Sequence, residues 1–294
     1  MHFGLGLAPA MDNFADIQLD TDLTVIGSGH FFRVGEEQFG VRGLIAIESV
    51  GPYTSVQRMG PMVMVHDGFF QPGFGIGHHP HRTNERLFYI LAGRVEHDDS
   101  LNHIRGTMNE GDLGRLTEGV RGMLHQEWNG ADDQVTRAFI LVYHPDTQPP
   151  IPVAEFAVLR AADRVQVREA PGVETLELVG PMSPFRVNHS GLRRYADTTL
   201  TDGAAVDVTP EPDRGLLLYP VEGSLRVMRD GRDEIVLSAS GSIHPEGPAN
   251  LAVAWSGDRG RAIRLRAEDG PARVLQIEFD RSGDDLVLGE SYQG

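Results

Sequence analysis

Short runs of apolar residues recur along the whole chain, separated by glycine and aspartate turn signals. The clearest runs are Met62–Val65, Leu87–Leu91, Ala138–Val142, Leu216–Tyr219 and Val274–Ile277. Few windows show the repeat of about 3.6 residues that marks an amphipathic helix, and the runs have the length of β-strands. The pattern predicts an all-β protein built from antiparallel barrels or sandwiches.

A cluster of prolines follows the first set of apolar runs. Its members are Pro145, Pro149, Pro150 and Pro152. Proline has no backbone N–H to donate, so it cannot occupy a central strand, and the cluster is expected to connect two parts of the chain. The length of 294 residues suits two domains of ordinary size. We therefore expect an N-terminal domain over residues 1–152 and a C-terminal domain over residues 153–294.

The two halves resemble each other at a fixed spacing. Three residues of the first half, Tyr89, Gly93 and Gly111, recur 130 residues later as Tyr219, Gly223 and Gly241. Self-similarity at a constant offset is the signature of a repeated structural unit. The pattern predicts a duplicated domain.

Composition and charge narrow the classes of partner. The formal net charge is -16, from 26 basic and 42 acidic residues, and no run of lysine or arginine could follow a phosphate backbone. We therefore expect no direct binding to nucleic acid. The chain has no cysteine, which excludes disulfides, thiolate nucleophiles and cysteine-ligated zinc or iron–sulfur sites. Any metal must bind through nitrogen and oxygen atoms.

The start of the chain has no targeting pattern. Residues Met1 to Ala10 contain neither the basic segment nor the long apolar segment of a signal peptide. No stretch approaches the roughly 18 apolar residues of a membrane-spanning helix. We therefore expect a soluble cytoplasmic protein that stays out of the bilayer.

Two short motifs carry the candidate chemistry: His79-Pro80-His81 and His125-Gln126-Glu127. Residues i and i+2 of a β-strand point to the same face, so each motif presents two ligands from one strand. The spacing predicts a metal site formed by three imidazoles and one carboxylate.

The second half lacks these ligands. At the offset of 130 residues the first motif becomes Thr209-Pro210-Glu211, and the positions of His125 and Glu127 become Trp255 and Gly257. We therefore expect a metal in the N-terminal domain alone, with the C-terminal domain supporting or shielding it.

Other polar residues near the motifs have less specific patterns. Four are expected on the surface: His78, Arg82, His97 and His103. His66 is left open between the surface and the cavity. Asn129 is a candidate for orienting a ligand through a hydrogen bond.

The two motifs and their spacing resemble those of a known family. The segments Gly75-(x)3-His79-Pro80-His81-Arg82-(x)2-Glu85-(x)7-Gly93 and Gly111-Asp112-(x)6-Gly119-(x)2-Gly122-(x)2-His125-Gln126-Glu127 are similar to the two cupin motifs of pirins and pirin-like quercetinases. The segment Met64–Phe69 resembles the one that precedes the metal motif in pirins. The likeness extends, more weakly, into the second half around Gly180-Pro181.

The chain departs from the usual pirin pattern at two places. Thr83-Asn84-Glu85-Arg86 stands where pirins usually have Gly-Phe-Glu-Thr, and Glu118 stands where they usually have a small residue. Both departures lie near the expected mouth of the cavity. Because the ligand set is intact, they bear on the substrate rather than on metal binding.

The resemblance implies a bicupin, with two jelly-roll barrels in tandem and iron bound by His79, His81, His125 and Glu127 in the N-terminal barrel. Its implied activity is that of a quercetin 2,3-dioxygenase, which cleaves a flavonol or related aromatic enol with O₂. Glu127 would be the catalytic residue that takes the substrate's hydroxyl proton. Fe(II) is the expected cofactor, and the ligand set also suits Mn, Ni, Co, Cu and Zn.

Two other functions fit the same motifs. One is a non-enzymatic regulator that responds to iron or redox state and binds a protein partner, as pirins are also thought to do. The other is a cupin isomerase or dioxygenase for a small polar substrate, which Arg86, Arg115 or Arg121 facing the cavity would favour. A flat aromatic substrate requires an apolar pocket beside the metal, whereas a sensor can have a narrow, wet one. The cavity therefore discriminates between these functions.

Overall fold

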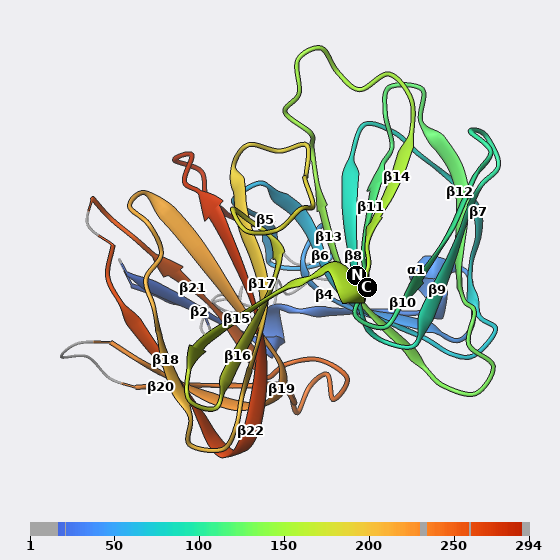
Figure 1. The fold of residues 1–294 in the computed structure, drawn as a ribbon. Coiled ribbons are helices and arrows are strands. Elements are labelled where there is room, and N and C mark those ends of the chain that lie inside the picture. The colour runs from blue at the N-terminus through green and yellow to red at the C-terminus, as the bar shows by residue number, and fades with distance from the viewer. Residues whose placement is uncertain (1–16, 21, 230–233, 259, 290–294) are drawn as a thin grey trace, which may run out of the picture.

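The computed structural model describes residues 17–20, 22–229, 234–258 and 260–289. These residues form two β-barrels that lie side by side, one built mainly from the first half of the chain and one mainly from the second (Figure 1). Within the described ranges, helix is limited to α1 (Glu36–Phe39) and the short turns η1 (Ser28–His30) and η2 (Ala161–Asp163). The all-β prediction is confirmed.

The first barrel has a nine-stranded sheet and a four-stranded sheet. The larger sheet contains β3 (Phe32–Val34), β4 (Leu44–Val50), β5 (Val56–Met59), β6 (Met62–Phe70), β8 (Glu85–Ala92), β11 (Leu113–Thr117), β13 (Thr136–Tyr143), β14 (Glu155–Leu159) and β23 (Leu286–Leu288). The smaller sheet contains β7 (Gly75–His81), β9 (Arg94–Asp99), β10 (Ile104–Asn109) and β12 (Met123–Asn129). The central order of the larger sheet is β14-β11-β8-β13-β6-β4-β3, and the smaller sheet runs β10-β9-β12-β7.

The second barrel is formed by a single ten-stranded sheet. Its strands are β1 (Ile17–Leu19), β2 (Leu23–Gly27), β15 (Val165–Ala170), β16 (Val173–Val179), β17 (Leu192–Leu200), β18 (Ala205–Val208), β19 (Arg214–Met228), β20 (Ile235–Ser238), β21 (Asn250–Trp255) and β22 (Ile263–Asp280). The order is β1-β2-β21-β19-β22-β17-β16-β15, with β18 beside β22 and β20 beside β19. The two long strands β19 and β22 therefore form the centre of this barrel.

The two ends of the chain cross between the barrels. β1 and β2 precede the first barrel in sequence but belong to the second, where β2 lies beside β21. In return, β14 lies beyond residue 152 but pairs with β11 of the first barrel, and the last strand, β23, pairs with β5. Strand pairing therefore does not follow a single division at residue 152, because each barrel receives strands from the other half.

The barrels share one apolar core between their larger sheets. Its largest buried side chains are aromatic and come from both halves: Phe139, Tyr89, Tyr143, Tyr195, Tyr219 and Phe279. Burial of aromatic and aliphatic surface is the main favourable term in folding. The interface between the halves is consequently buried and mainly apolar.

Two reciprocal polar clusters lie within this interface. Arg137 forms an ion pair with Asp67 at 2.7 Å, and the hydroxyl of Tyr219, from the other half, donates to Asp67 at 3.3 Å. The mirror cluster has Arg273 at 2.7 Å and Tyr89 at 2.6 Å from Asp197. Each half thus supplies an Asp–Arg pair and receives a tyrosine hydroxyl from the other, so the buried carboxylates are satisfied. This reciprocity supports the duplication expected from the sequence.

Among the described residues, no helix has the length and apolar character required to cross a membrane. Residues Met1 to Ala10, which the sequence analysis considered as a targeting segment, lie outside the described residues.

Candidate metal centre

The four predicted ligands lie on two neighbouring strands. His79 and His81 come from β7, and His125 and Glu127 come from β12, with His125 opposite His79 in the antiparallel ladder. The ligand nitrogens of the three histidines all lie within 4.8 Å of one another. The Glu127 carboxylate lies 3.2 Å from Nδ1 of His125 and 3.9 Å from Nε2 of His79. The structure brings the four side chains together, and their role as ligands stays a prediction.

An irregularity in the pairing of β7 with β12 aims these side chains. The register shifts between His125 and Glu127, and a bulge of this kind turns nearby side chains in a new direction. At Gly75 the strands come so close that a Cβ atom would lie 2.1 Å from the carbonyl oxygen of Glu127. Only glycine fits there, so Gly75 permits the close approach of the two ligand-bearing strands.

Most of the donor atoms fit a transition metal. Nδ1 of His79 lies 2.8 Å from the carbonyl oxygen of Gly77, so Nδ1 carries the proton and the lone pair of Nε2 is available. Nε2 of His125 and Oε1 of Glu127 are buried and have no hydrogen-bond partner in the described part of the chain. Buried polar atoms almost always have a partner, and a bound cation would provide one. Imidazole and carboxylate donors suit iron, manganese and nickel.

Burial sets the protonation of these groups in the absence of a metal. It lowers the pKa of His81 to about 3, and it also lowers the pKa of His79 and of His125. The imidazoles are therefore neutral at pH 7, which is the form that binds a metal. Burial raises the pKa of Glu127 to about 7, while the charge of Arg86 acts in the opposite direction.

The two departures from the pirin pattern form one ion pair beside the site. Nε of Arg86 donates to Oε1 of Glu118 at 2.8 Å, and Oε2 of Glu118 accepts from the backbone N–H of Asn84 at 2.8 Å. Nη2 of Arg86 also lies 2.7 Å from Nδ1 of His81. A guanidinium can only donate, so Nδ1 of His81 accepts and the neutral ring carries its proton on Nε2. To bind a metal through Nε2, the ring of His81 must therefore lose its proton from Nε2.

His97 is part of the same cluster, and its predicted surface position was wrong. Its side chain is only 2% exposed, its ring stacks on Phe156 at 5.1 Å, and its Nδ1 lies 3.4 Å from Nδ1 of His125. Burial lowers the pKa of His97 to about 4. The signal was present in the alternation of β9, where Val95, His97 and Asp99 are buried at every second position. His97, His125 and Glu127 form a second group of ligand atoms within 4.8 Å.

Four other polar residues lie near the two motifs. His78, Arg82 and His103 are exposed, as expected. The role suggested for Asn129 was wrong, because its side-chain hydrogen bonds go to backbone atoms of Phe70, Ala131 and Gln134. Asn129 therefore holds the turn after β12 and does not orient a ligand.

A cavity of about 480 Å³ lies beside the candidate ligands. His79, His81 and Glu127 border it, and most of its remaining lining is apolar. The larger apolar side chains are Phe39, Leu44, Met64, Phe70, Ile76, Phe88, Ile140 and Val142. The polar side chains on the same surface include His66, which the sequence analysis had left open, together with Glu48 and Arg86. The cavity thus places a small polar region within a mainly apolar wall.

The second barrel has apolar side chains at the ligand positions. When the ladders are aligned from Tyr89 and Tyr219, the counterparts of His79, His97, His125 and Glu127 are Val208, Val227, Ile263 and Leu265. All four counterparts are buried in one apolar cluster. The predicted counterparts Trp255 and Gly257 were wrong in position, because the later strands of the two halves are not separated by 130 residues. Of the described residues, only the first barrel brings such ligands together.

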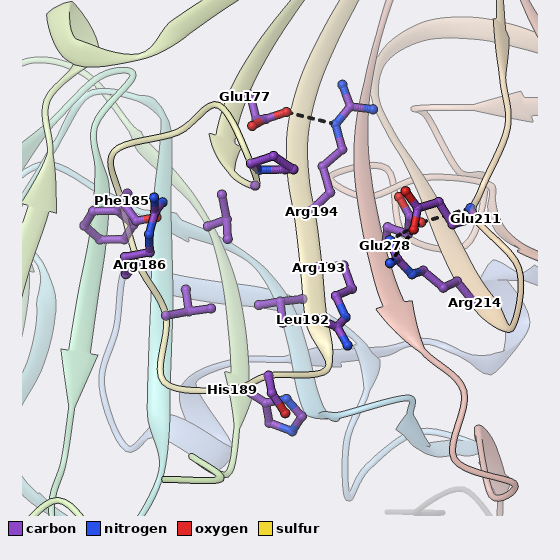
Figure 2. Close-up of a pocket in the computed structure, with 15 residues that line it drawn as sticks. Glu177, Phe185, Arg186, His189, Leu192, Arg193, Arg194, Glu211, Arg214 and Glu278 are labelled. Carbon is purple, nitrogen blue, oxygen red and sulfur yellow. Dashed lines mark hydrogen bonds and ion pairs between the residues drawn. The ribbon is translucent and has the colours of Figure 1, made fainter.

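The second barrel also has a pocket, of about 560 Å³, but its charged groups are paired (Figure 2). Figure 2 shows Arg194 directed at Glu177, and Arg214 directed at Glu211 and Glu278. Arg193 forms an ion pair with Asp280 at 2.5 Å. These three guanidinium groups have carboxylate partners, whereas Arg186, which also lines the pocket, donates to backbone carbonyl oxygens of Ser183 and Phe185.

Comparison with known proteins identifies the relatives of this chain. The model of the Pirin family matches residues 35–141. Pirin-1 of Arabidopsis thaliana is 24% identical over 207 residues, which span 70% of each chain. A relative from Pseudomonas aeruginosa is 26% identical over 184 residues, and the chain spans 64% of that protein's length. A quercetin 2,3-dioxygenase of Escherichia coli is 35% identical over 66 residues, or 22% of this chain and 28% of that protein.

Solved structures share the fold over most of the chain. The quercetin 2,3-dioxygenase of Acinetobacter baumannii superposes with a TM-score of 0.68 and 18% identity, covering 87% of this chain and 85% of that one. The bacterial pirin YhhW of Escherichia coli, in complex with nickel(II), gives a TM-score of 0.63 and 14% identity, covering 88% and 100%. The tandem arrangement of two barrels is therefore that of a bicupin. Residues 35–141 match the Pirin family model, and the chain is similar to pirins over most of its length.

Proposed function

We propose that the protein is a metal-dependent dioxygenase of the quercetin 2,3-dioxygenase type. Its substrate is a flavonol or a related aromatic enol, which it cleaves with O₂. His79, His81, His125 and Glu127 hold the metal. Fe(II) is the first candidate because the ligand set is close to that of the non-heme iron oxygenases. Nickel is the second, since the structure of the Escherichia coli pirin contains nickel(II).

The cavity is the observation that carries this proposal. Its volume of about 480 Å³ lies within the range of small-molecule sites, and its walls are mostly apolar. A flat aromatic ring can bind such walls beside His79 and Glu127, whereas a metal-dependent sensor needs no such space. The cavity therefore supports an enzyme over the non-enzymatic regulator that binds a protein partner.

The arginines near the site support an aromatic substrate over a small acid. Arg115 and Arg121 do not border the cavity. Arg115 forms an ion pair with Glu155 at 2.9 Å, and Arg121 donates to the carbonyl oxygen of Leu101 at 3.4 Å. Arg86 does border it, but Glu118 neutralises its charge. The cavity thus presents no unpaired cation to a carboxylate substrate.

We assign the proton transfer to a residue that borders the cavity. When bound, the metal supplies Lewis acidity for the substrate oxygen and the redox chemistry of O₂. Glu127 takes the proton of the substrate hydroxyl, because its carboxylate borders the cavity. Phe70 and Phe88 pack against the ring and exclude water from it.

Oxygen uptake tests this proposal directly. Protein reconstituted with Fe(II), or with Ni(II), is mixed with quercetin, and O₂ consumption and bound metal are both measured. We expect uptake in the wild type and none in His79→Ala, which loses metal. His78→Ala is the matched control: His78 is the exposed neighbour, so metal content and uptake should be unchanged. Bound metal without uptake of O₂ for quercetin or other flavonols would overturn the proposed activity.

A further inference from the structure

A buried histidine–carboxylate pair borders the cavity on the sheet opposite the candidate ligands. Nε2 of His66, on β6, lies 2.7 Å from Oε2 of Glu48, on β4. Their side chains are 11% and 1% exposed. Both strands belong to the nine-stranded sheet, whereas β7 and β12 belong to the four-stranded sheet. The cavity therefore has polar groups on two facing walls.

The hydrogen bonds of Glu48 determine which ring nitrogen of His66 donates and which accepts. Oε1 of Glu48 accepts from the backbone N–H of Tyr53 at 2.8 Å, which leaves Oε2 for the ring. A carboxylate only accepts, so in the singly protonated ring Nε2 carries the proton and donates. Nδ1 is then the acceptor. It has no hydrogen bond in the part of the chain that the structure describes, and His66 borders the cavity.

A comparison with the second barrel distinguishes the role of Glu48 from that of His66. Glu177 occupies the equivalent place on β16, where its Oε1 accepts from the backbone N–H of Met182 at 2.6 Å, as Glu48 does from Tyr53. The turn that follows is Gly-Pro in both halves. The ladder partner of Glu48 is His66, whereas that of Glu177 is Ala196. Holding the turn thus requires only the glutamate, and the histidine is present only in the barrel with the apolar cavity.

His66 and Arg86 lie on different strands of the nine-stranded sheet. Arg86, which contacts His81, is on β8, and β6 is two strands further along the sheet. At a spacing of about 4.8 Å between strands, this separation is roughly 10 Å. A molecule with several rings can span it, and a single small acid cannot. Phe88 and Ile140 lie in the same cross-strand row as His66, so the surface between them is apolar.

From this geometry we propose that His66 is a specificity-determining residue that accepts a hydrogen bond from a distal hydroxyl of the substrate. The inference rests on the proposed function and narrows it to flavonols that carry a second hydroxyl on the ring furthest from the metal. Glu48 is a positioning residue, because it acts by fixing the tautomer of His66. A methyl ether at the same place cannot donate and is therefore bound less well.

Anaerobic binding to the Fe(II)-loaded protein tests the proposal without turnover. The probes are 4′-hydroxyflavonol and 4′-methoxyflavonol, together with the matching pair substituted at position 7, so that either end of the molecule can face His66. We expect the wild type to bind one hydroxyl compound about five- to tenfold more tightly than its ether, which corresponds to one hydrogen bond. Equal affinities within both pairs, or preference for the ether, would overturn the assignment of Nδ1 as an acceptor.

Glu48→Gln is the decisive variant. Its amide oxygen stays on the N–H of Tyr53, so its NH₂ group faces His66 and donates to Nε2. The ring must then carry its proton on Nδ1, which turns the acceptor into a donor. We expect the preference for the hydroxyl to be lost or reversed, while Glu177→Gln, the matched change in the second barrel, leaves it unchanged. An unaltered preference in Glu48→Gln would refute the proposal.

A second variant keeps the test independent of the behaviour of Glu48→Gln. His66→Leu should bind the hydroxyl compound and the ether alike, and a thermal unfolding curve checks that it is folded. A hydroxyl preference that persists in folded His66→Leu contradicts the inference. The readout also separates the two proposals: a wild type that shows the preference but consumes no O₂ loses the dioxygenase function and keeps the distal contact.

Discussion

The two barrels use the same strand framework for opposite purposes. Where the first barrel has His79, His97, His125 and Glu127, the second has Val208, Val227, Ile263 and Leu265. The first set leaves buried polar atoms without partners, whereas the second set is part of an apolar core. Leaving a buried polar group unpaired costs about 1–3 kcal/mol. The comparison teaches that the first barrel gives up stability in its metal-free form in order to keep a binding site.

The largest effect is expected from converting the first barrel into the second. His125→Ile combined with Glu127→Leu removes two of the four candidate ligands and replaces them with the side chains of the other barrel. We expect bound metal and O₂ uptake to be lost. The free energy of unfolding of the metal-free protein should rise by about 1–3 kcal/mol for each of the two unpaired polar atoms that are removed. Metal analysis and denaturant unfolding in chelator measure both. Retention of a full equivalent of metal would show that the site lies elsewhere.

Removing the arginine from either Asp–Arg pair of the interface should lower the free energy of unfolding by the same amount. Arg137→Met leaves Asp67 buried without its cation, and Arg273→Met does the same to Asp197. Removing one partner of a buried ion pair costs about 3–5 kcal/mol. We expect this loss from each variant in denaturant unfolding, and almost none from the control Arg266→Met, an exposed arginine on the same strand as Arg273. Unequal losses would show that the two halves are not energetically equivalent.

The ion pair of Arg86 and Glu118 is another difference between the barrels. Their ladder counterparts are Leu216 and Ser256, and Ser256 accepts a backbone N–H as Glu118 does. Arg86→Leu alone leaves Glu118 buried and unpaired, so we expect a loss of about 3 kcal/mol or more. The double variant Arg86→Leu/Glu118→Ser should lose much less. A double-mutant cycle in denaturant measures the difference, and simple additivity would mean that the two side chains are not coupled.

A smaller effect is expected from the titration of Glu127 in the metal-free protein. Its folded-state pKa is raised from 4.5 to about 7, so protonation favours the folded state. Stability from this group is present below about pH 4.5 and is lost as the pH rises to about 7, by on the order of 3 kcal/mol. Glu127→Gln cannot titrate, so its stability relative to wild type should increase across that range. Unfolding curves in chelator between pH 4.5 and 8 check the sign, and a constant difference would contradict it.

Local patterns in the sequence predicted the strands and the ligand cluster. Alternation places His79 with His81, and His125 with Glu127, on one face of a strand, and that geometry needs no knowledge of the fold. His97 was missed because the hairpin was taken as exposed. Its burial depends on Phe156, which comes from β14 beyond the expected domain boundary. The exchange of strands between the barrels was missed because local patterns do not specify which edge a strand will join.

The ion pair of Arg86 and Glu118 shows a further limit of sequence interpretation. Each residue was noticed separately as a departure from the pirin pattern, 32 positions apart. Only the pairing of β8 with β11 brings them together. A contact of this kind depends on tertiary structure, so one sequence can identify its members without identifying the pair.

The crossing of the chain ends has a consequence for protein synthesis. β2 pairs with β1 on one side, but its other edge has no partner until β21 has left the ribosome, more than two hundred residues later. At about 5–20 residues per second, the wait is roughly ten to fifty seconds. During that time an unpaired strand edge is available to other nascent chains, which is a recognised route to aggregation. One edge of β5 waits in the same way for β23, so neither barrel can be completed until a strand more than two hundred residues later has been made.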